Sequence, residues 1–161
     1  MRILMVCLGN ICRSPLAEGI LKHKAKKAAL DWTIDSAGTA HQLTGAAPHK
    51  LSQKVAAMNG IDIGYQQCRQ FVKEDILNFD RIYVMDSENY NDVKKISGNL
   101  WNENTVELIM NELHPGKNIN IPDPWFGTEE GYHKVYKMIS DACDAIIEKY
   151  SAPTLKGLRQ Y

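Results

Sequence analysis

A cysteine and an arginine near the start of the chain could together bind and attack a phosphate group. Residues 7–14 read Cys-Leu-Gly-Asn-Ile-Cys-Arg-Ser, so five residues separate Cys7 from Arg13. That is enough for one tight loop whose backbone N–H groups turn inward around a tetrahedral oxyanion. A helix N-terminus after the loop would add positive potential to the charge of Arg13, and such surroundings favour the thiolate form of cysteine. The pattern therefore predicts a Cys7 thiolate facing a bound phosphate.

The spacing of Cys7 and Arg13 alone is weak evidence for a phosphate-binding loop, and the residues around it make the prediction stronger. An apolar run at residues 2–6 predicts a buried strand before the loop, and Gly9-Asn10 suits a tight turn within it. Ser14-Pro15 is typical of a helix start, with Ser14 as the cap. The plainer alternative makes Cys7 a small buried apolar residue at a strand end. A nucleotide-binding loop is disfavoured because the loop has one glycine and lacks a Gly-Lys-Ser/Thr ending. The predicted phosphate-binding residues besides Arg13 are Leu8, Gly9, Asn10, Ile11, Cys12 and Ser14.

A second candidate for chemistry is the run Asp123-Pro124-Trp125-Phe126. Phosphoryl transfer from an ester needs an acid that protonates the leaving oxygen, and Asp123 in a turn stiffened by proline suits that role. Trp125 and Phe126 could wall a slot for a flat substrate. Taken alone, the run is more commonly an Asp-Pro turn with aromatics covering the core. The presence of Cys7 and Arg13 favours the catalytic interpretation.

Strand-like and helix-like segments alternate along the chain and predict how these residues are positioned. Apolar runs predict strands at residues 2–6, 32–36, 81–85 and 118–121. Helical spacing predicts helices at about residues 15–29, 48–59, 87–96, 104–113 and 128–150. Within residues 48–59, Leu51, Val55 and Met58 share one face and Gly60 is the stop signal, while Cys143 in the last helix is expected in the core.

This alternation predicts an α/β fold with a small, mostly parallel four-stranded sheet flanked by helices. The phosphate-binding loop would lie between the first strand and the first helix. In such folds ligands bind at the carboxyl ends of the strands, which is where Cys7 falls.

Length and composition limit the functional classes. The 161 residues suit a single domain over residues 1–161, with a tail after about residue 153 that could be loosely held. Nineteen basic and nineteen acidic residues give zero formal charge, which argues against nucleic acid or an anionic membrane as partner. The N-terminal apolar stretch is too short for a signal peptide or a membrane span, so a cytoplasmic protein is expected.

The cysteines also favour a cytoplasmic protein. Cys7, Cys12, Cys68 and Cys143 show neither metal-ligand spacing nor a secreted disulfide framework, which fits a reducing compartment. Because the loop curls, Cys7 and Cys12 could still meet in a reversible disulfide that protects the nucleophile.

Over nearly its whole length the chain resembles the low-molecular-weight protein tyrosine phosphatases. The matching motifs are CLGNICRSP with the following Ala-Glu, DSAGT at 35–39, Arg69-Gln70 followed by Lys73-Glu74-Asp75, Met85-Asp86, and DPWFG at 123–127. The resemblance implies an enzyme that hydrolyses phosphotyrosine in protein substrates and releases inorganic phosphate.

The same resemblance implies the residue roles. Cys7 would be the nucleophile, Arg13 would bind phosphate and stabilise the transition state, and Asp123 would serve as general acid and then as base. Asn10, Ser14 and Ser36 would shape the loop and stabilise the thiolate, with the Ser14 hydroxyl donating to the Cys7 sulfur. No metal or cofactor is expected, because side chains supply the nucleophile, the acid and the charge stabiliser.

The chain departs from the family pattern at three places. Gln42, followed by Leu43, stands where an aromatic residue usually forms the far wall of the slot, so the predicted slot is Gln42, Leu43, Trp125 and Phe126. Gln66 replaces a common histidine and Cys68 a common alanine. These changes concern substrate preference and loop tuning.

Three alternatives remain. Related arginine phosphatases tend to have threonine where Leu8 and Ile11 stand, which disfavours that activity. Arsenate reductases of this fold need further cysteines after the third strand, and residues 80–100 contain none. A non-catalytic phosphate-binding module would be expected to lack the nucleophile or the acid, and this chain has both.

Overall fold

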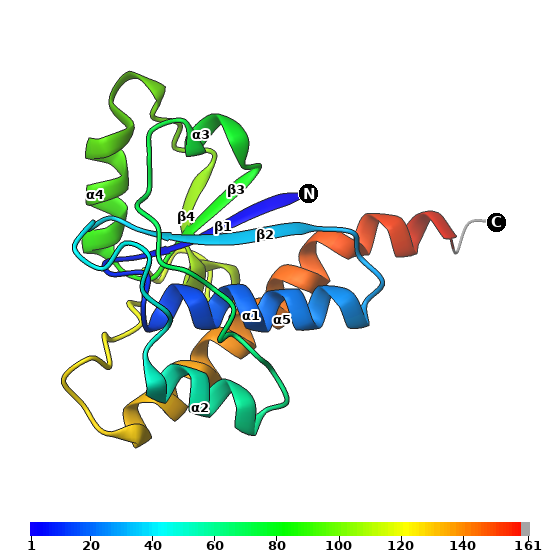
Figure 1. Cartoon of the computed structure of the whole chain (residues 1–161). Helices are drawn as coiled ribbons and strands as arrows, with labels where there is room; N and C mark the ends of the chain where they lie inside the picture. The colour runs from blue at the N-terminus through cyan, green and yellow to red at the C-terminus, as the bar shows by residue number, and fades with distance from the viewer. Residues whose placement is uncertain (159–161) are drawn as a thin grey trace.

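Four parallel strands form the central sheet. The computed structural model describes the backbone of residues 1–158 and the side chains of residues 1–151. The strands are β1 (Arg2–Cys7), β2 (Thr33–Gly38), β3 (Arg81–Val84) and β4 (Val106–Leu108), in the order β2-β1-β3-β4 (Figure 1). The expected α/β fold with a four-stranded parallel sheet is confirmed.

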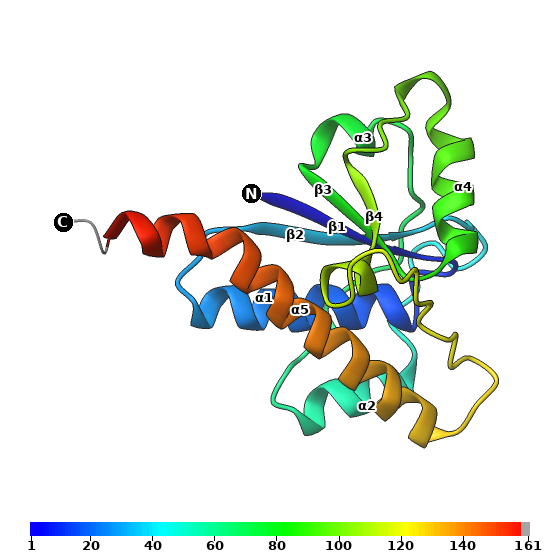
Figure 2. The ribbon, with the colours of Figure 1, turned by 180° about the vertical axis from the view of Figure 1, so that it is seen from behind.

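Helices cover both faces of this sheet. On one face lie α1 (Arg13–Lys27) and the long α5 (Glu129–Leu158), with α2 (Lys50–Met58) packed against both of them on the side away from the sheet (Figures 1 and 2). On the other face lie α3 (Asp75–Asn78) and α4 (Ser87–Ser97). Short 3-10 helices occupy Gly98–Leu100 and Ile109–Glu112. No helix of the described residues is long and apolar enough to cross a membrane.

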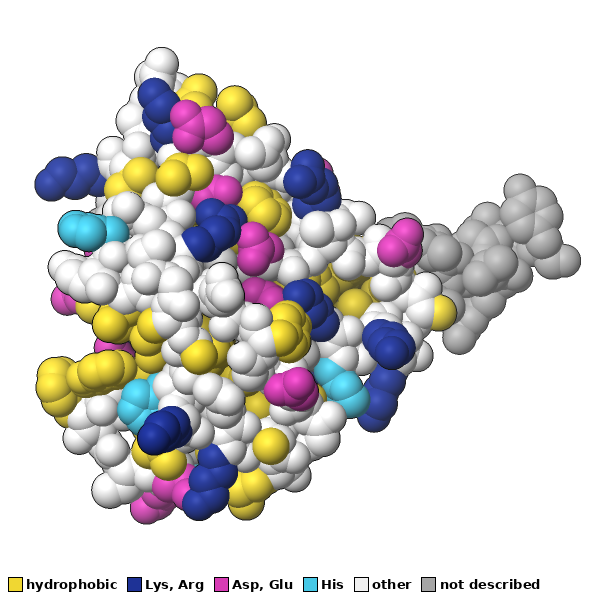
Figure 3. Space-filling view, in the orientation of Figure 1, with side chains coloured by type: hydrophobic (Ala, Val, Ile, Leu, Met, Phe, Trp, Pro, Cys, Tyr) yellow, Lys and Arg dark blue, Asp and Glu magenta, His cyan; other side chains and the backbone are white. Residues whose placement is uncertain are grey.

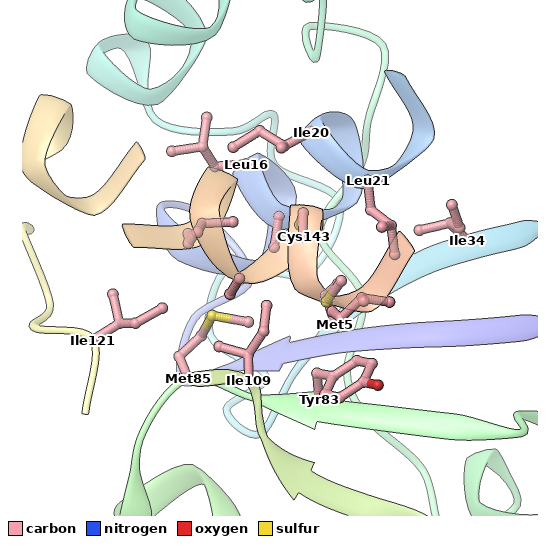
Figure 4. Packing of buried hydrophobic residues seen from close by; sticks show 14 of the residues in the cluster. Met5, Leu16, Ile20, Leu21, Ile34, Tyr83, Met85, Ile109, Ile121 and Cys143 are labelled. Atoms are coloured by element: carbon pink, nitrogen blue, oxygen red, sulfur yellow. The ribbon is translucent and has the colours of Figure 1, made fainter. Parts of the chain in front are cut away.

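The alternation of side chains along β1 divides the core into two layers. Successive strand residues point to opposite faces, so Met5 packs under α1 and α5, whereas Leu4 and Val6 pack on the α4 side. Cys143 of α5 is fully buried in the first layer, as expected from its helical spacing (Figure 4). Burying one such aliphatic side chain stabilises the fold by about 1.5–3 kcal/mol. The layers therefore hold β1, which ends at Cys7, between two packed surfaces.

The first helix begins earlier than the sequence predicts. It starts at Arg13, directly after Cys12, and Ser14 makes no capping bond. Pro15 still lies in the first turn, where its missing N–H has no intrahelical partner. The expected capping role of Ser14 is wrong because its hydroxyl is used by the loop instead.

The segment between β3 and α5 differs most from expectation. The predicted strand at 118–121 and the predicted helix at 104–113 are both wrong, since β4 lies at Val106–Leu108. Val106 and Leu108 are buried on either side of a half-buried Glu107, the period of a strand. Ile121 instead makes one backbone bond, from its N–H to the Met85 carbonyl at 2.9 Å, beside the end of β3. The segment leading to Asp123 thus reaches the carboxyl end of the sheet without joining it.

Smaller differences concern the elements around α2. Gly60 has a φ of +76° and follows the end of α2, as predicted. Val55 is fully buried, but Met58 is 62% exposed and does not belong to the core face. The sequence gives no signal for the single turn α3. The expected loose tail begins within α5, whose backbone continues to Leu158, and residues 159–161 lie outside the described residues.

Candidate active site

The loop between β1 and α1 surrounds the Cys7 sulfur with hydrogen-bond donors. Cys7 is the last residue of β1, at the carboxyl end of the sheet. Its Sγ accepts from the Asn10 backbone N–H at 3.2 Å and lies 3.1 Å from Ser14 Oγ. When Cys7 is ionised, the Ser14 hydroxyl is the only possible donor of that pair. Two hydrogen-bonding groups of the loop therefore lie against the sulfur.

Asn10 links the loop to neighbouring segments through its side chain. It has a φ of +54°, a left-handed conformation that asparagine tolerates better than most residues. Its Nδ2 donates to Ser14 Oγ at 2.8 Å and to Ser36 Oγ at 3.0 Å. The Ser36 hydroxyl in turn donates to the buried carboxylate of Glu18 at 2.7 Å. Asn10, Ser14 and Ser36 are therefore joined by side-chain hydrogen bonds next to the loop.

Arg13 is held by partners at its side-chain tip. Its Nη1 donates to Asp86 Oδ2 at 2.6 Å and to the Ile121 carbonyl at 2.8 Å, and its side chain is 3% exposed. Asp86 follows β3 and also caps α4, accepting from the Asn89 N–H at 2.8 Å. The sequence did not predict the pairing of Asp86 with Arg13. Its position directly after a strand, at the same sheet edge as Cys7, was the available signal.

Cys7 and Arg13 line a pocket of about 260 Å³ at the carboxyl ends of the strands. Asp123 and the expected slot residues all border it, together with most of the loop. The lining is Cys7, Leu8, Gly9, Ile11, Cys12, Arg13, Ala40, Gln42, Leu43, Asp123, Trp125 and Phe126. Asn10, Ser14 and Ser36 are buried and do not belong to the lining. Figure 3 shows hydrophobic side chains gathered at the left edge of the molecule, where the carboxyl end of β1 lies in Figure 1.

The segment carrying Asp123 is exposed and braced by aromatic contacts. Asp123 Oδ1 accepts from the Trp125 N–H at 3.1 Å. Trp125 meets the ring of His49 edge-on at 5.4 Å, and His49 stacks on Tyr132 at 5.2 Å. Phe126 is 97% exposed, so it stands at the pocket rim without covering the core. Sequence reasoning missed His49 and Tyr132, because their contacts join segments far apart in the chain.

Cys12 lies in the same loop but in different surroundings from Cys7. Its Sγ is 3.5 Å from the Tyr132 hydroxyl, and burial raises the pKa of the Cys12 thiol to about 11. Cys12 is therefore a neutral thiol at physiological pH. All four cysteines are free thiols in the structure.

Comparison with known proteins agrees with this geometry. Residues 2–154 match the family described as low molecular weight phosphotyrosine protein phosphatase. The protein of that name from Mus musculus is 34% identical over 149 residues, which cover 91% of this chain and 94% of the mouse protein.

Solved structures give the same result. A protein tyrosine phosphatase from Entamoeba histolytica superposes with a TM-score of 0.87 and 32% identity, covering 96% of this chain and 99% of its own. A Drosophila arginine phosphatase superposes with a TM-score of 0.86 and 30% identity, covering 93% and 98%. The chain therefore belongs to the low molecular weight phosphotyrosine protein phosphatase family and is, by that membership, a protein tyrosine phosphatase.

Proposed function

We propose that the protein hydrolyses phosphotyrosine in protein substrates through a phosphocysteine intermediate on Cys7. The observation that carries the proposal is the position of the Cys7 sulfur. It accepts from Asn10 and contacts Ser14, and it lines one pocket with Arg13 and Asp123. A nucleophile, a cation and an acid thus border the same space.

In the first step the Cys7 thiolate attacks phosphorus, so that an S–P bond forms as the P–O bond to the tyrosine breaks. Asp123 gives its proton to the departing phenolate oxygen. Arg13 and the loop amides stabilise the charge on the three equatorial oxygens. Within the described residues, the N–H groups of Gly9, Ile11 and Cys12 donate to no protein acceptor, which leaves them for an oxyanion.

In the second step water attacks the phosphocysteine. The Asp123 carboxylate accepts a proton from that water as the new P–O bond forms and the S–P bond breaks. Inorganic phosphate leaves, and Cys7 returns to the thiolate. Because the nucleophile must stay reduced, we place the enzyme in a reducing, cytoplasmic compartment.

Phosphoarginine is the second candidate substrate, because an arginine phosphatase is among the structural neighbours. The pocket favours phosphotyrosine. Leu8 and Ile11 give it an apolar lining on the loop side, and Trp125 and Phe126 offer aromatic surface to a phenyl ring. A guanidinium substrate would instead need polar partners for its N–H groups.

The test compares wild type with Cys7→Ser on p-nitrophenyl phosphate and on matched phosphotyrosine and phosphoarginine peptides. Wild type should hydrolyse the first two and retain full activity after EDTA treatment. Cys7→Ser should lose turnover but keep phosphate or vanadate binding, since the loop amides and Arg13 remain. Turnover by Cys7→Ser would overturn the mechanism, and a preference for phosphoarginine would overturn the substrate.

A further inference from the structure

One peptide bond of the phosphate-binding loop is hydrogen-bonded at both ends by cysteine sulfur. The N–H of the Gly9–Asn10 peptide donates to Cys7 Sγ at 3.2 Å. The carbonyl of the same peptide accepts from the thiol of Cys68 at 3.0 Å. The two thiols are therefore linked through a single peptide unit, with Cys68 as the donor at one end and Cys7 as the acceptor at the other.

Cys68 is itself firmly placed. It is 4% exposed, its N–H donates to the Ala46 carbonyl at 2.8 Å, and its carbonyl accepts from the Gly45 N–H at 2.8 Å. The next residue also reaches the loop, because the Arg69 N–H donates to Asn10 Oδ1 at 3.0 Å. Cys68 thus binds the peptide that precedes Asn10, and Arg69 binds the Asn10 side chain.

Gly38 closes the space near the same peptide. A Cβ placed on Gly38 would lie 2.8 Å from the Leu8 carbonyl oxygen and 2.9 Å from the Asn10 nitrogen. The backbone of β2 therefore touches the loop directly. With Gly38 in contact and Cys68 bonded to the carbonyl, the peptide has little room to rotate.

Rotation of this peptide would matter, because it would turn the Asn10 N–H away from Cys7. We propose that Cys68 is a positioning residue of the phosphatase, whose S–H holds and polarises the Gly9–Asn10 peptide so that its N–H donates to the Cys7 thiolate. This inference rests on the proposed role of Cys7 as nucleophile. A donor on a peptide carbonyl strengthens the hydrogen bond made by the N–H of the same peptide.

Two properties keep Cys68 in the donor role. Burial, and then the nearby charge of Cys7, raise the pKa of Cys68, so that it remains a neutral thiol when Cys7 is ionised. A thiol is a weak donor, so its effect on Cys7 should be modest. Alanine at this position would remove the donor and leave the backbone bonds of residue 68 available.

The test measures how readily Cys7 ionises in wild type, Cys68→Ala, Cys68→Ser and the exposed-neighbour control Gln67→Ala. Each protein is alkylated with iodoacetamide from pH 4 to 9, and modification of the Cys7 peptide is followed by mass spectrometry. We expect the pH of half-maximal alkylation in Cys68→Ala to rise by about half a unit, which slows the reaction about threefold at low pH. Cys68→Ser, which keeps an O–H donor, should lie between Cys68→Ala and wild type. Gln67→Ala should match wild type.

The alkylation profile needs no turnover, so it separates this inference from the mechanism. If Cys68→Ala gives the wild-type profile, Cys68 does not influence Cys7 and the inference is wrong. If Cys68→Ser shifts as far as Cys68→Ala, Cys68 acts by its volume and not as a donor, and the inference is also wrong. If Cys7→Ser retains turnover, the proposed mechanism fails whatever the alkylation profile shows. A thermal unfolding curve of each variant distinguishes a local shift from general loosening of the fold.

Discussion

The guanidinium of Arg13 lies 2.6 Å from the carboxylate of Asp86 while its side chain is almost fully buried. The same nitrogen donates to the Ile121 carbonyl, so the tip of Arg13 is fixed from β3 and from the segment before Asp123. A guanidinium carries five N–H donors, and only Nη1 is used by these partners. The fork is therefore oriented before a phosphate arrives.

We expect Arg13→Lys to lose activity by a factor on the order of 100 or more. An ammonium cannot bind two phosphate oxygens as a planar fork does, and loss of one transition-state donor typically costs 10²–10³ in kcat. Steady-state kinetics on p-nitrophenyl phosphate measure the effect, with the exposed Lys73→Arg as a matched control. Near-normal kcat in Arg13→Lys would contradict the proposed role of Arg13.

The loop and its flanking elements could be predicted from sequence because their signals are local. A buried strand, a turn and a helix start follow one another within residues 2–15, and each can be recognised from its residue types. The residues that contact this loop from elsewhere in the chain cannot be recognised in this way. Asp86 and Tyr132 meet it only through tertiary packing, at sequence separations of 73 and 120 residues.

The wrong strand assignment has a similar cause. Residues 118–121 alternate in polarity as a strand does, and Ile121 is buried. The backbone of Ile121 nevertheless makes one bond to Met85 and no ladder, because β4 already pairs with β3. Competition between two short segments for one sheet edge is decided by packing, which single-sequence periodicity does not record.

Gln42 leaves one wall of the slot without an aromatic ring. We therefore expect aryl phosphates to bind more weakly than they would with an aromatic residue at position 42. Gln42 and Leu43 line the same pocket as Trp125. Gln42→Trp should lower KM for phosphotyrosine about fivefold, equivalent to roughly 1 kcal/mol of ring stacking. The value of kcat should change little if the ring binds ground and transition states alike. His41→Trp, which is exposed and outside the lining, is the control, and an unchanged KM in Gln42→Trp would exclude residue 42 from the slot.

Cys12 is predicted to protect Cys7 from irreversible oxidation. Peroxide should convert the Cys7 thiolate to a sulfenic acid, and attack by Cys12 should then form a disulfide and release water. The raised pKa of Cys12 makes the thiolate scarce at neutral pH, so capture should accelerate as the pH rises toward about 11. Recovery of activity by dithiothreitol after peroxide treatment is the measurement.

In Cys12→Ser, recovery should fall well below that of wild type, each protein being normalised to its untreated activity. Cys143→Ala, which removes a free thiol from the core side of α5, serves as the matched control. If Cys12→Ser recovers as fully as wild type, Cys12 has no protective role.

Glu18 should make stability depend on pH. Burial raises the pKa of this carboxyl, although Lys22 and Ser36 donate to it and lower the pKa in part. The folded state therefore holds the proton more tightly than the unfolded state, whose pKa is near 4.5. The contribution of Glu18 to the free energy of unfolding is then greatest below pH 4.5 and is lost as pH rises toward the folded-state pKa.

Glu18→Gln, which cannot ionise, tests this sign. Urea unfolding of the variant and wild type should show the variant gaining stability relative to wild type as pH rises from 4 to 8. The exposed Glu130→Gln is the control and should show no such trend, because a surface pair contributes little. A variant that loses relative stability over this interval would show that the pairing with Lys22 outweighs burial.

The role of Asp123 as the acid predicts a dependence on the leaving group. The phenol of tyrosine has a pKa of about 10, so its oxygen needs a proton as the ester bond breaks, whereas a nitrophenolate is far more stable as an anion. Asp123→Ala should therefore slow the burst phase with phosphotyrosine considerably more than with p-nitrophenyl phosphate. Asp123→Asn keeps the side chain's size and its acceptor for the Trp125 N–H, so it separates loss of the proton from disturbance of the turn.

The second chemical step should respond differently to the same substitutions. Hydrolysis of phosphocysteine needs Asp123 as a base whatever the leaving group was, so steady-state kcat should fall for both substrates. Phosphoenzyme should then accumulate with p-nitrophenyl phosphate, where the first step stays fast, and acid quenching with mass spectrometry would detect it. If the two burst rates instead fall by one common factor, Asp123 does not protonate the leaving group. Asp86, which borders Arg13 at the end of β3, is then the next carboxylate to test.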